Sequence, residues 1–94
     1  MKSGTIRASK DQVSCVLDGE TVILLQSTGK YFGLNEVGSR VWEIVQTPCT
    51  FDGIVSRLTD EFAVNREKLE LDVDRLLLEM LKAKLIEVSD ASAP

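Results

Sequence analysis

The stretch from Thr28 to Trp42, TGKYFGLNEVGSRVW, constrains the fold of this chain more than any other. Thr28-Gly29 is a turn signal between two apolar runs. Lys30 to Leu34 then predicts a short strand. Asn35 is a strong helix N-cap, because its side-chain oxygen can accept hydrogen bonds from the free amides of the next turn. Apolar residues recur at helical spacing after it. A hairpin therefore leads directly into a helix, and its last strand is a candidate sheet edge.

Two more strands are predicted ahead of this hairpin. Val13 to Leu17 alternates in the manner of a half-buried strand, with Cys15 as a small buried hydrophobe. Asp18-Gly19 is a hairpin turn signal. Thr21 to Gln26 contains four consecutive apolar residues, which predicts a strand covered on both faces. Three strands cannot cover both faces themselves, so helices must take one of them, and the cover of the other is left open.

The second half of the chain predicts three helices. The first begins at Asn35 and stops near Gln46, before a proline. Thr50 caps the second and Asn65 caps the third, whose periodic segment runs from Lys68 to Lys84. Trp42 belongs to the apolar stripe of the first helix, so we assign it to the core.

The third helix has one strong apolar face and two leucines elsewhere. Leu69, Val73, Leu76, Leu77 and Met80 fall on the face expected in the core. Leu71 and Leu78 lie nearly opposite. They are either ordinary exposed leucines or a second apolar line that faces a partner or the sheet edge.

These elements predict an α+β domain, winged helix-turn-helix-like, with a three-stranded antiparallel β-meander followed by three α-helices. Residues 1–10 form a polar N-terminal segment, with a candidate extended piece at Thr5 to Ala8. Residues 11–88 form the domain, which closes with a short apolar run from Leu85 to Val88. Residues 89–94 are expected to be a flexible C-terminal tail.

Composition narrows the possible functions. The 94 residues contain no histidine, which removes the commonest general base and the commonest metal ligand. The formal net charge is −4 and the third helix is rich in acids, so a helix placed in a DNA groove would meet phosphate repulsively. We therefore expect no nucleic acid partner. A winged-helix DNA-binding transcriptional regulator is the alternative that keeps the fold and changes the ligand.

Two cysteines, Cys15 and Cys49, fit no metal-ligand spacing, and we expect free thiols rather than a disulfide. No metal or other cofactor is predicted, and Cys49 would lack a histidine base for catalysis. No segment approaches the length needed to span a membrane. The sequence thus predicts a cytoplasmic protein that is not an enzyme and has no membrane partner.

The order of these motifs carries a family resemblance. The stretch LDGETVILLQSTGKYFGLNEVGSRVWEIV resembles the opening of the PqqD family, small winged-helix domains also called RiPP recognition elements. The later stretch FDGIVSRLTDEFAVNREKLELDVDRLLLEMLKAKLIEV is similar to the rest of the family pattern, including the E-F-x-V hinge and an Asp-Val pair. The resemblance covers Val13 to Val88. It departs at Lys84, where the family often has a glycine that would end the third helix in a left-handed conformation.

The resemblance implies that the chain binds the leader segment of a ribosomally made precursor peptide. In the family, the leader adds as a strand to the third strand of the sheet and lies in a cleft against the third helix. Such domains deliver the precursor to a tailoring enzyme, such as a radical SAM enzyme or a leader peptidase. The protein would be a monomer or a weak homodimer, since an exposed edge can also pair with itself.

Matched by position, the family site falls on one strand and one helix. The strand supplies Lys30, Tyr31, Phe32, Gly33 and Leu34, and the helix supplies Asp72, Arg75, Leu76 and Glu79. Gly33 fits either a close approach by another chain or a bulge before the helix cap. Of Tyr31 and Phe32, one is expected in the core and the other near the leader. Arg75 and Lys82 are candidates to pair with an acidic leader residue, and the alternative for all these charges is a solvated helix face.

Overall fold

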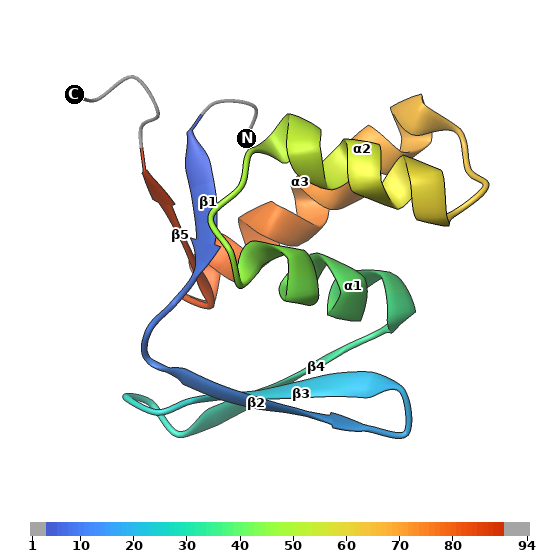
Figure 1. Cartoon of the computed structure of the whole chain (residues 1–94). Helices are drawn as coiled ribbons and strands as arrows, with labels where there is room; N and C mark the ends of the chain where they lie inside the picture. The colour runs from blue at the N-terminus through green and yellow to red at the C-terminus, as the bar shows by residue number, and fades with distance from the viewer. Residues whose placement is uncertain (1–3, 90–94) are drawn as a thin grey trace.

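The computed structural model describes residues 4–89, which form two small sheets and three helices (Figure 1). The order of the elements is β1 (Thr5–Ala8), β2 (Gln12–Leu17), β3 (Glu20–Leu25), β4 (Lys30–Leu34), α1 (Glu36–Val45), α2 (Phe51–Glu61), α3 (Arg66–Lys82) and β5 (Ile86–Ser89). The main sheet is an antiparallel meander in the order β2-β3-β4, and the three helices follow it. The predicted α+β fold class is confirmed.

The helices begin where capping side chains satisfy their first amides. Asn35 Oδ1 accepts from Gly38 N at 2.8 Å, Thr50 Oγ1 accepts from Gly53 N at 3.1 Å, and Asn65 Oδ1 accepts from Lys68 N at 3.1 Å. All three caps lie where the sequence predicts them. The third helix begins and ends about one half-turn before the predicted segment, because the helical backbone already starts directly after its cap.

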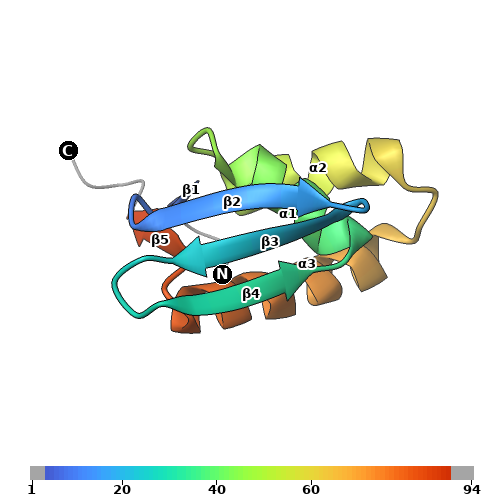
Figure 2. The ribbon, with the colours of Figure 1, turned by 90° about the horizontal axis from the view of Figure 1, so that it is seen from below.

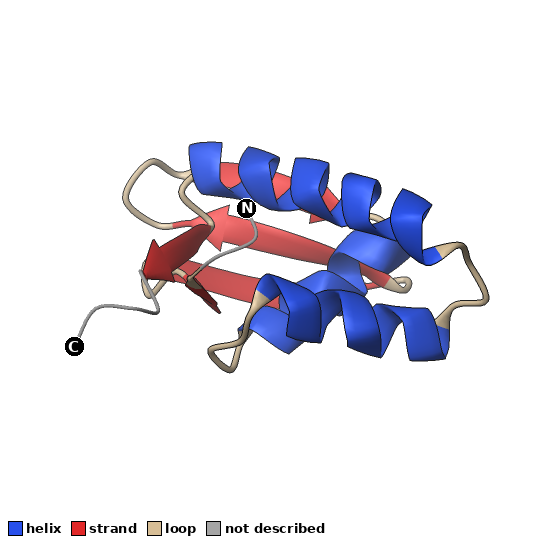
Figure 3. Ribbon diagram, turned by 90° about the horizontal axis from the view of Figure 1, so that it is seen from above, coloured by secondary structure: helices blue, strands red, loops and turns tan. Residues whose placement is uncertain are grey.

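All three helices lie on one side of the main sheet, as the views from the side and from above show (Figures 1 and 3). The core between these two layers takes Ile23 and Leu25 from β3, Leu34 from β4 and the apolar faces of the helices. Trp42 is buried there as predicted, and its indole N–H donates to Ser14 Oγ at 3.1 Å.

The opposite face of the sheet, the outer face, is left uncovered by the described residues. The pairing register places on it Val13, Cys15 and Leu17 of β2, Val22 and Leu24 of β3, and Tyr31 and Gly33 of β4. The prediction of a buried Cys15 is therefore wrong, because its thiol is exposed. The helix-facing positions of β2 are instead Gln12, Ser14 and Val16, since Ser14 meets the indole of Trp42.

A second sheet joins the two ends of the described chain. β1 pairs with β5 in antiparallel register, from Thr5 opposite Ser89 to Ala8 opposite Ile86. Ile6 is fully buried, and its backbone also exchanges hydrogen bonds of 2.7 and 2.9 Å with Cys49. The sequence analysis predicts that residues 1–10 form a polar segment separate from the domain. In the structure, Thr5–Ala8 packs on the same core as the helices. Of the predicted tail, Ser89 ends β5, and residues 90–94 lie outside the described part of the chain.

The end of α3 is sharp although glycine is absent. Lys84 has a φ of 64°, in the left-handed region. Its N–H donates to Leu81 O at 3.0 Å, and Leu85 N donates to Met80 O at 2.9 Å, which together form a Schellman motif. Lysine therefore keeps the abrupt end that glycine would supply, at some cost in backbone strain. The turn also brings Leu85 beside Met80, and both are buried.

Within residues 4–89, no helix is long and apolar enough to cross a bilayer. In the same part of the chain, histidine, cysteine, aspartate and glutamate side chains form no group of three or more that could hold a metal ion.

Candidate functional site

A cleft separates the β4 edge of the main sheet from α3, which runs alongside that strand (Figure 2). We call it the β4–α3 cleft. Its volume is about 430 Å³, within the range of pockets that hold small ligands. Four of its lining residues belong to β4 and the others to α3 and the turn after it, and the full set is Tyr31, Phe32, Gly33, Leu34, Leu76, Glu79, Met80, Ala83 and Leu85.

The direction of each backbone group in β3 follows from the bonds at its two ends. Thr21 N donates to Ser39 Oγ at 3.0 Å, and that hydroxyl donates to Leu34 O at 3.1 Å, so Thr21 faces β4. Gln26 N donates in the other direction, to Asp11 O at 3.1 Å on the β2 side. In antiparallel pairing, backbone groups alternate in direction along a strand. The odd-numbered residues of β3 therefore bond to β4.

This alternation identifies the open groups of β4. The β3 residues that face β4 are paired with Lys30, Phe32 and Leu34, whose N–H and C=O groups therefore point into the sheet. The N–H and C=O groups of Tyr31 and Gly33 point out of it, toward the cleft. Two donors and two acceptors thus lie along this edge, with the wall of α3 beside them.

The Ser39 hydroxyl sets the end of this edge. It accepts from Thr21 N and donates to Leu34 O, so it replaces the direct bond that would close the ladder between β3 and β4. Ser39 and Thr21 are both buried, which strengthens the need for every polar group there to have a partner. Helix α1 is thereby joined to the last residue of β4.

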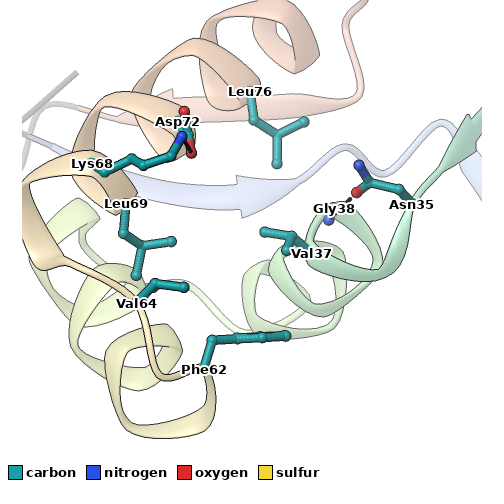
Figure 4. Close-up of a pocket in the computed structure, with 9 residues that line it drawn as sticks. All are labelled: Asn35, Val37, Gly38, Phe62, Val64, Lys68, Leu69, Asp72 and Leu76. Atoms are coloured by element: carbon teal, nitrogen blue, oxygen red, sulfur yellow. Dashed lines mark hydrogen bonds and ion pairs between the residues drawn. The ribbon is translucent and has the colours of Figure 1, made fainter.

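A second depression continues beyond Leu34, between the start of α1 and the turn that joins α2 to α3 (Figure 4). We call it the hinge pocket. It has a volume of about 310 Å³. Val37, Phe62, Val64, Leu69 and Leu76 give it apolar walls, with Asn35 and Gly38 at one end and the exposed pair Lys68 and Asp72 at the other. The Lys68 ammonium lies 3.2 Å from the Asp72 carboxylate. Leu76 is common to both depressions.

One ion pair holds the hinge pocket in shape. Arg40 Nε donates to Glu61 Oε1 at 2.6 Å and Arg40 Nη2 donates to Glu61 Oε2 at 2.7 Å, which makes a two-pronged contact between α1 and the end of α2. The hydrogen bonds from Arg40 lower the pKa of the Glu61 carboxyl, and the same bonds raise the pKa of Arg40. Because Glu61 directly precedes Phe62, this contact fixes one wall of the pocket.

The structure brings most of the predicted site residues together. Tyr31 to Leu34, Leu76 and Glu79 line the β4–α3 cleft, and Asp72 lines the hinge pocket. Lys30 begins β4 and Arg75 lies exposed on α3, and within residues 4–89 neither is among the lining residues of the two depressions.

Several lining residues escaped the sequence prediction. Met80, Ala83 and Leu85 form part of the cleft wall. Asp72, Leu76, Glu79 and Ala83 recur at helical spacing, so a wheel centred on Asp72 and Glu79 would have found Ala83. Leu85 could not be found in this way, because it reaches the cleft only through the left-handed turn at Lys84.

Residues 20–86 match the family model described as Coenzyme PQQ synthesis protein D (PqqD). The chain belongs to the PqqD family. One similar solved structure is that of "TbiB1 in Complex with the TbiA(beta) Leader Peptide". It is 33% identical to this PqqD-family chain, and the match covers 94% of this chain and 99% of the other with a TM-score of 0.80. No curated protein matches the sequence.

A second solved structure, "Lasso peptide synthetase B1 complexed with the leader peptide", shares the same fold. Its TM-score is 0.77 over 87% of this chain and 96% of its own, at 20% identity. The PqqD-family fold thus extends over nearly the whole chain, including strands that lie outside the matched residues 20–86.

Proposed function

We propose that this protein binds the leader segment of a ribosomally synthesised precursor peptide as an additional strand on β4. The observation that carries the proposal is the outward backbone of Tyr31 and Gly33 beside the β4–α3 cleft. An extended peptide gains main-chain hydrogen bonds at such an edge, and pockets for its alternate side chains give specificity. Membership of the PqqD family and the likeness to a TbiB1 structure that contains a leader peptide support the same function.

The alternation of side chains along the added strand separates two environments. Leader residues opposite Phe32 direct their side chains toward α3, where Leu76, Met80 and Ala83 offer an apolar wall. Glu79 lies exposed on the same wall. Arg75, also exposed, precedes it by one helical turn on α3. Both charges are therefore available to leader residues at the rim of the cleft. The leader residues before and after the one opposite Phe32 direct their side chains to the outer face of the sheet.

The hinge pocket extends the binding surface beyond the last residue of β4. A leader that continues past Leu34 reaches apolar walls within a few residues, and one apolar side chain fits a volume of about 310 Å³. The pocket therefore supplies an anchor outside the ladder. The ion pair of Lys68 and Asp72 lies at the rim of this pocket, next to the anchoring side chain.

We assign this chain a carrier role rather than a catalytic one. Burial raises the pKa of the Cys49 thiol, which keeps it in its unreactive protonated form. The sequence contains no histidine to act as its base. In this proposal the bound precursor is presented to a separate modifying enzyme or leader peptidase, and the domain acts as a monomer or weak homodimer.

The test is a pair of titrations with the purified protein. One uses a fluorescein-labelled synthetic peptide that corresponds to the leader of a precursor peptide from the same gene neighbourhood, and the other uses a labelled DNA duplex at several salt concentrations. We expect micromolar or tighter binding of the leader and no binding of DNA at moderate salt. DNA binding with a steep salt dependence, and no leader binding, would instead support a transcriptional regulator.

A further inference from the structure

Nothing in the backbone or packing of the free domain requires a glycine at position 33. Its φ is not positive, it pairs regularly with Val22, and a Cβ built on it would meet nothing within 4 Å. The regular register also excludes the bulge that was the alternative for this residue. Glycine in a strand interior weakens the strand, because it adds backbone entropy to the unfolded chain and offers no side chain to pack. Its presence at this edge therefore points to something that approaches the strand.

The missing side chain of Gly33 leaves a gap in a defined place. By register it lies on the outer face, beside the half-buried Val22 of β3 and two residues from Tyr31. Tyr31 is 70% exposed. The gap is therefore bordered by apolar surface on the sheet side and open on the edge side, where an added strand would lie.

We propose that the bound leader places an aromatic side chain over Gly33, on the face of the sheet that points away from α3. This proposal rests on the proposed strand addition and adds the chemistry of one leader position. The leader residue opposite Gly33 shares its face, because directly paired residues in a sheet point the same way. An aromatic ring across from an edge glycine lies over the bare backbone and replaces the packing that glycine lacks.

An aromatic ring suits this position better than a short aliphatic side chain. The diagonal neighbour on β4 lies about 7–8 Å away, which aromatic side chains can reach. The ring therefore contacts Tyr31 as well as the Gly33 backbone, and offset or edge-to-face pairs of rings add to the burial of their area. Gly33 thus acts as a specificity residue for the outward side of the leader, while the cleft reads its inward side.

The direct test uses NMR of the isotope-labelled protein with the unlabelled leader peptide that the titration uses. We expect contacts between leader ring protons and both the Gly33 Hα and the Val22 methyl groups, with an upfield shift of one Gly33 Hα. We also expect Gly33→Ala to weaken leader binding by about twofold to fivefold without a change in circular dichroism. Replacing the leader aromatic with leucine should abolish the difference between the two proteins.

Cys15→Ala is the matched control, because Cys15 lies in the same row of the outer face, on the far side of Val22. It should leave leader affinity unchanged. A leader that binds at β4 with no aromatic contact at Gly33, or equally well to Gly33→Ala, overturns this inference and leaves the proposed function intact. A leader that does not bind the wild-type protein overturns both.

Discussion

At the scale of single residues, Lys84 carries strain that the fold tolerates. Its φ of 64° is disfavoured for a residue with a Cβ. Lys84→Gly should raise the free energy of unfolding by about 1 kcal/mol, as measured by urea denaturation. Arg75→Gly is the control, because Arg75 is exposed in the middle of α3, where glycine should lower stability by a similar amount. A loss of stability in both variants would mean that the left-handed turn is wrongly placed.

Ser39 is the residue that joins α1 to the sheet. Ser39→Ala removes the hydroxyl that bridges Thr21 N and Leu34 O, and leaves both groups buried without that partner. We expect the free energy of unfolding to fall by about 1–3 kcal/mol. The exposed Ser27 provides the comparison, and Ser27→Ala should change stability by less than about 0.5 kcal/mol. Equal effects of the two substitutions would argue against the bridge.

The pair of Arg40 and Glu61 predicts a dependence of stability on pH. The folded protein lowers the pKa of Glu61 below its ordinary value of 4.5, chiefly through hydrogen bonds from Arg40. The contribution of this pair is therefore present above the ordinary pKa and is lost as the pH falls through the lowered one. Glu61→Gln should lower the melting temperature at pH 7, and the two proteins should converge in acid.

Equal melting temperatures of Glu61→Gln and wild type in acid would show that the effect at pH 7 comes from the charge of Glu61. Glu20→Gln, at the exposed start of β3, should differ little from wild type at either pH. If the deficit of Glu61→Gln persisted unchanged in acid, the effect would be one of packing rather than of charge. Added salt should also reduce the deficit at pH 7, because the pair is only partly buried.

At the scale of elements, a proline in β4 removes a different kind of backbone N–H at successive residues. Tyr31→Pro deletes an N–H that points out of the sheet, and edge strands tolerate proline at such positions. Phe32→Pro deletes an N–H that bonds to β3, and should lower the melting temperature. We expect Tyr31→Pro to keep its fold and to bind the leader about tenfold more weakly than Tyr31→Ala.

The comparison with Tyr31→Ala isolates the amide, because both variants lose the phenol ring. Fluorescence anisotropy with the labelled leader measures the affinities, and circular dichroism checks the fold. Equal affinities for the proline and alanine variants would mean that the Tyr31 amide takes no part in binding.

Local signals fixed most of these elements in advance. The caps at Asn35, Thr50 and Asn65 act on amides three residues away, so they are legible in the sequence. The sequence did not predict which side of β2 faces the helices. Val13, Cys15 and Leu17 are the more apolar set, yet they lie on the outer face, because the contact between Ser14 and Trp42 depends on how α1 crosses the sheet.

At the scale of the whole molecule, the features that sequence missed are those made by distant segments. β1 and β5 lie at opposite ends of the described chain, and no local pattern encodes their pairing. The cleft was predicted from its strand and helix, but its end depends on Leu85 after the left-handed turn. The identity of the open backbone groups at β4 depends on the register of all three strands of the main sheet.

Both edge strands of the main sheet are candidates for strand addition, and the surroundings distinguish them. β2 and β4 each have one neighbour in the sheet. Only β4, among the described strands of that sheet, also borders the cleft with α3. Added main-chain bonds at β4 therefore come together with side-chain pockets, whereas β2 offers bonds with exposed neighbours.

Amide hydrogen exchange of β4, followed by NMR with and without the leader peptide, tests the strand addition most directly. The N–H groups of Tyr31 and Gly33 should exchange fast in the free protein and become protected when the leader binds. That of Phe32 should be slower in both states, because it already bonds to β3. Protection that appeared along β2 instead, or binding that left Tyr31 and Gly33 exchanging fast, would contradict strand addition at β4.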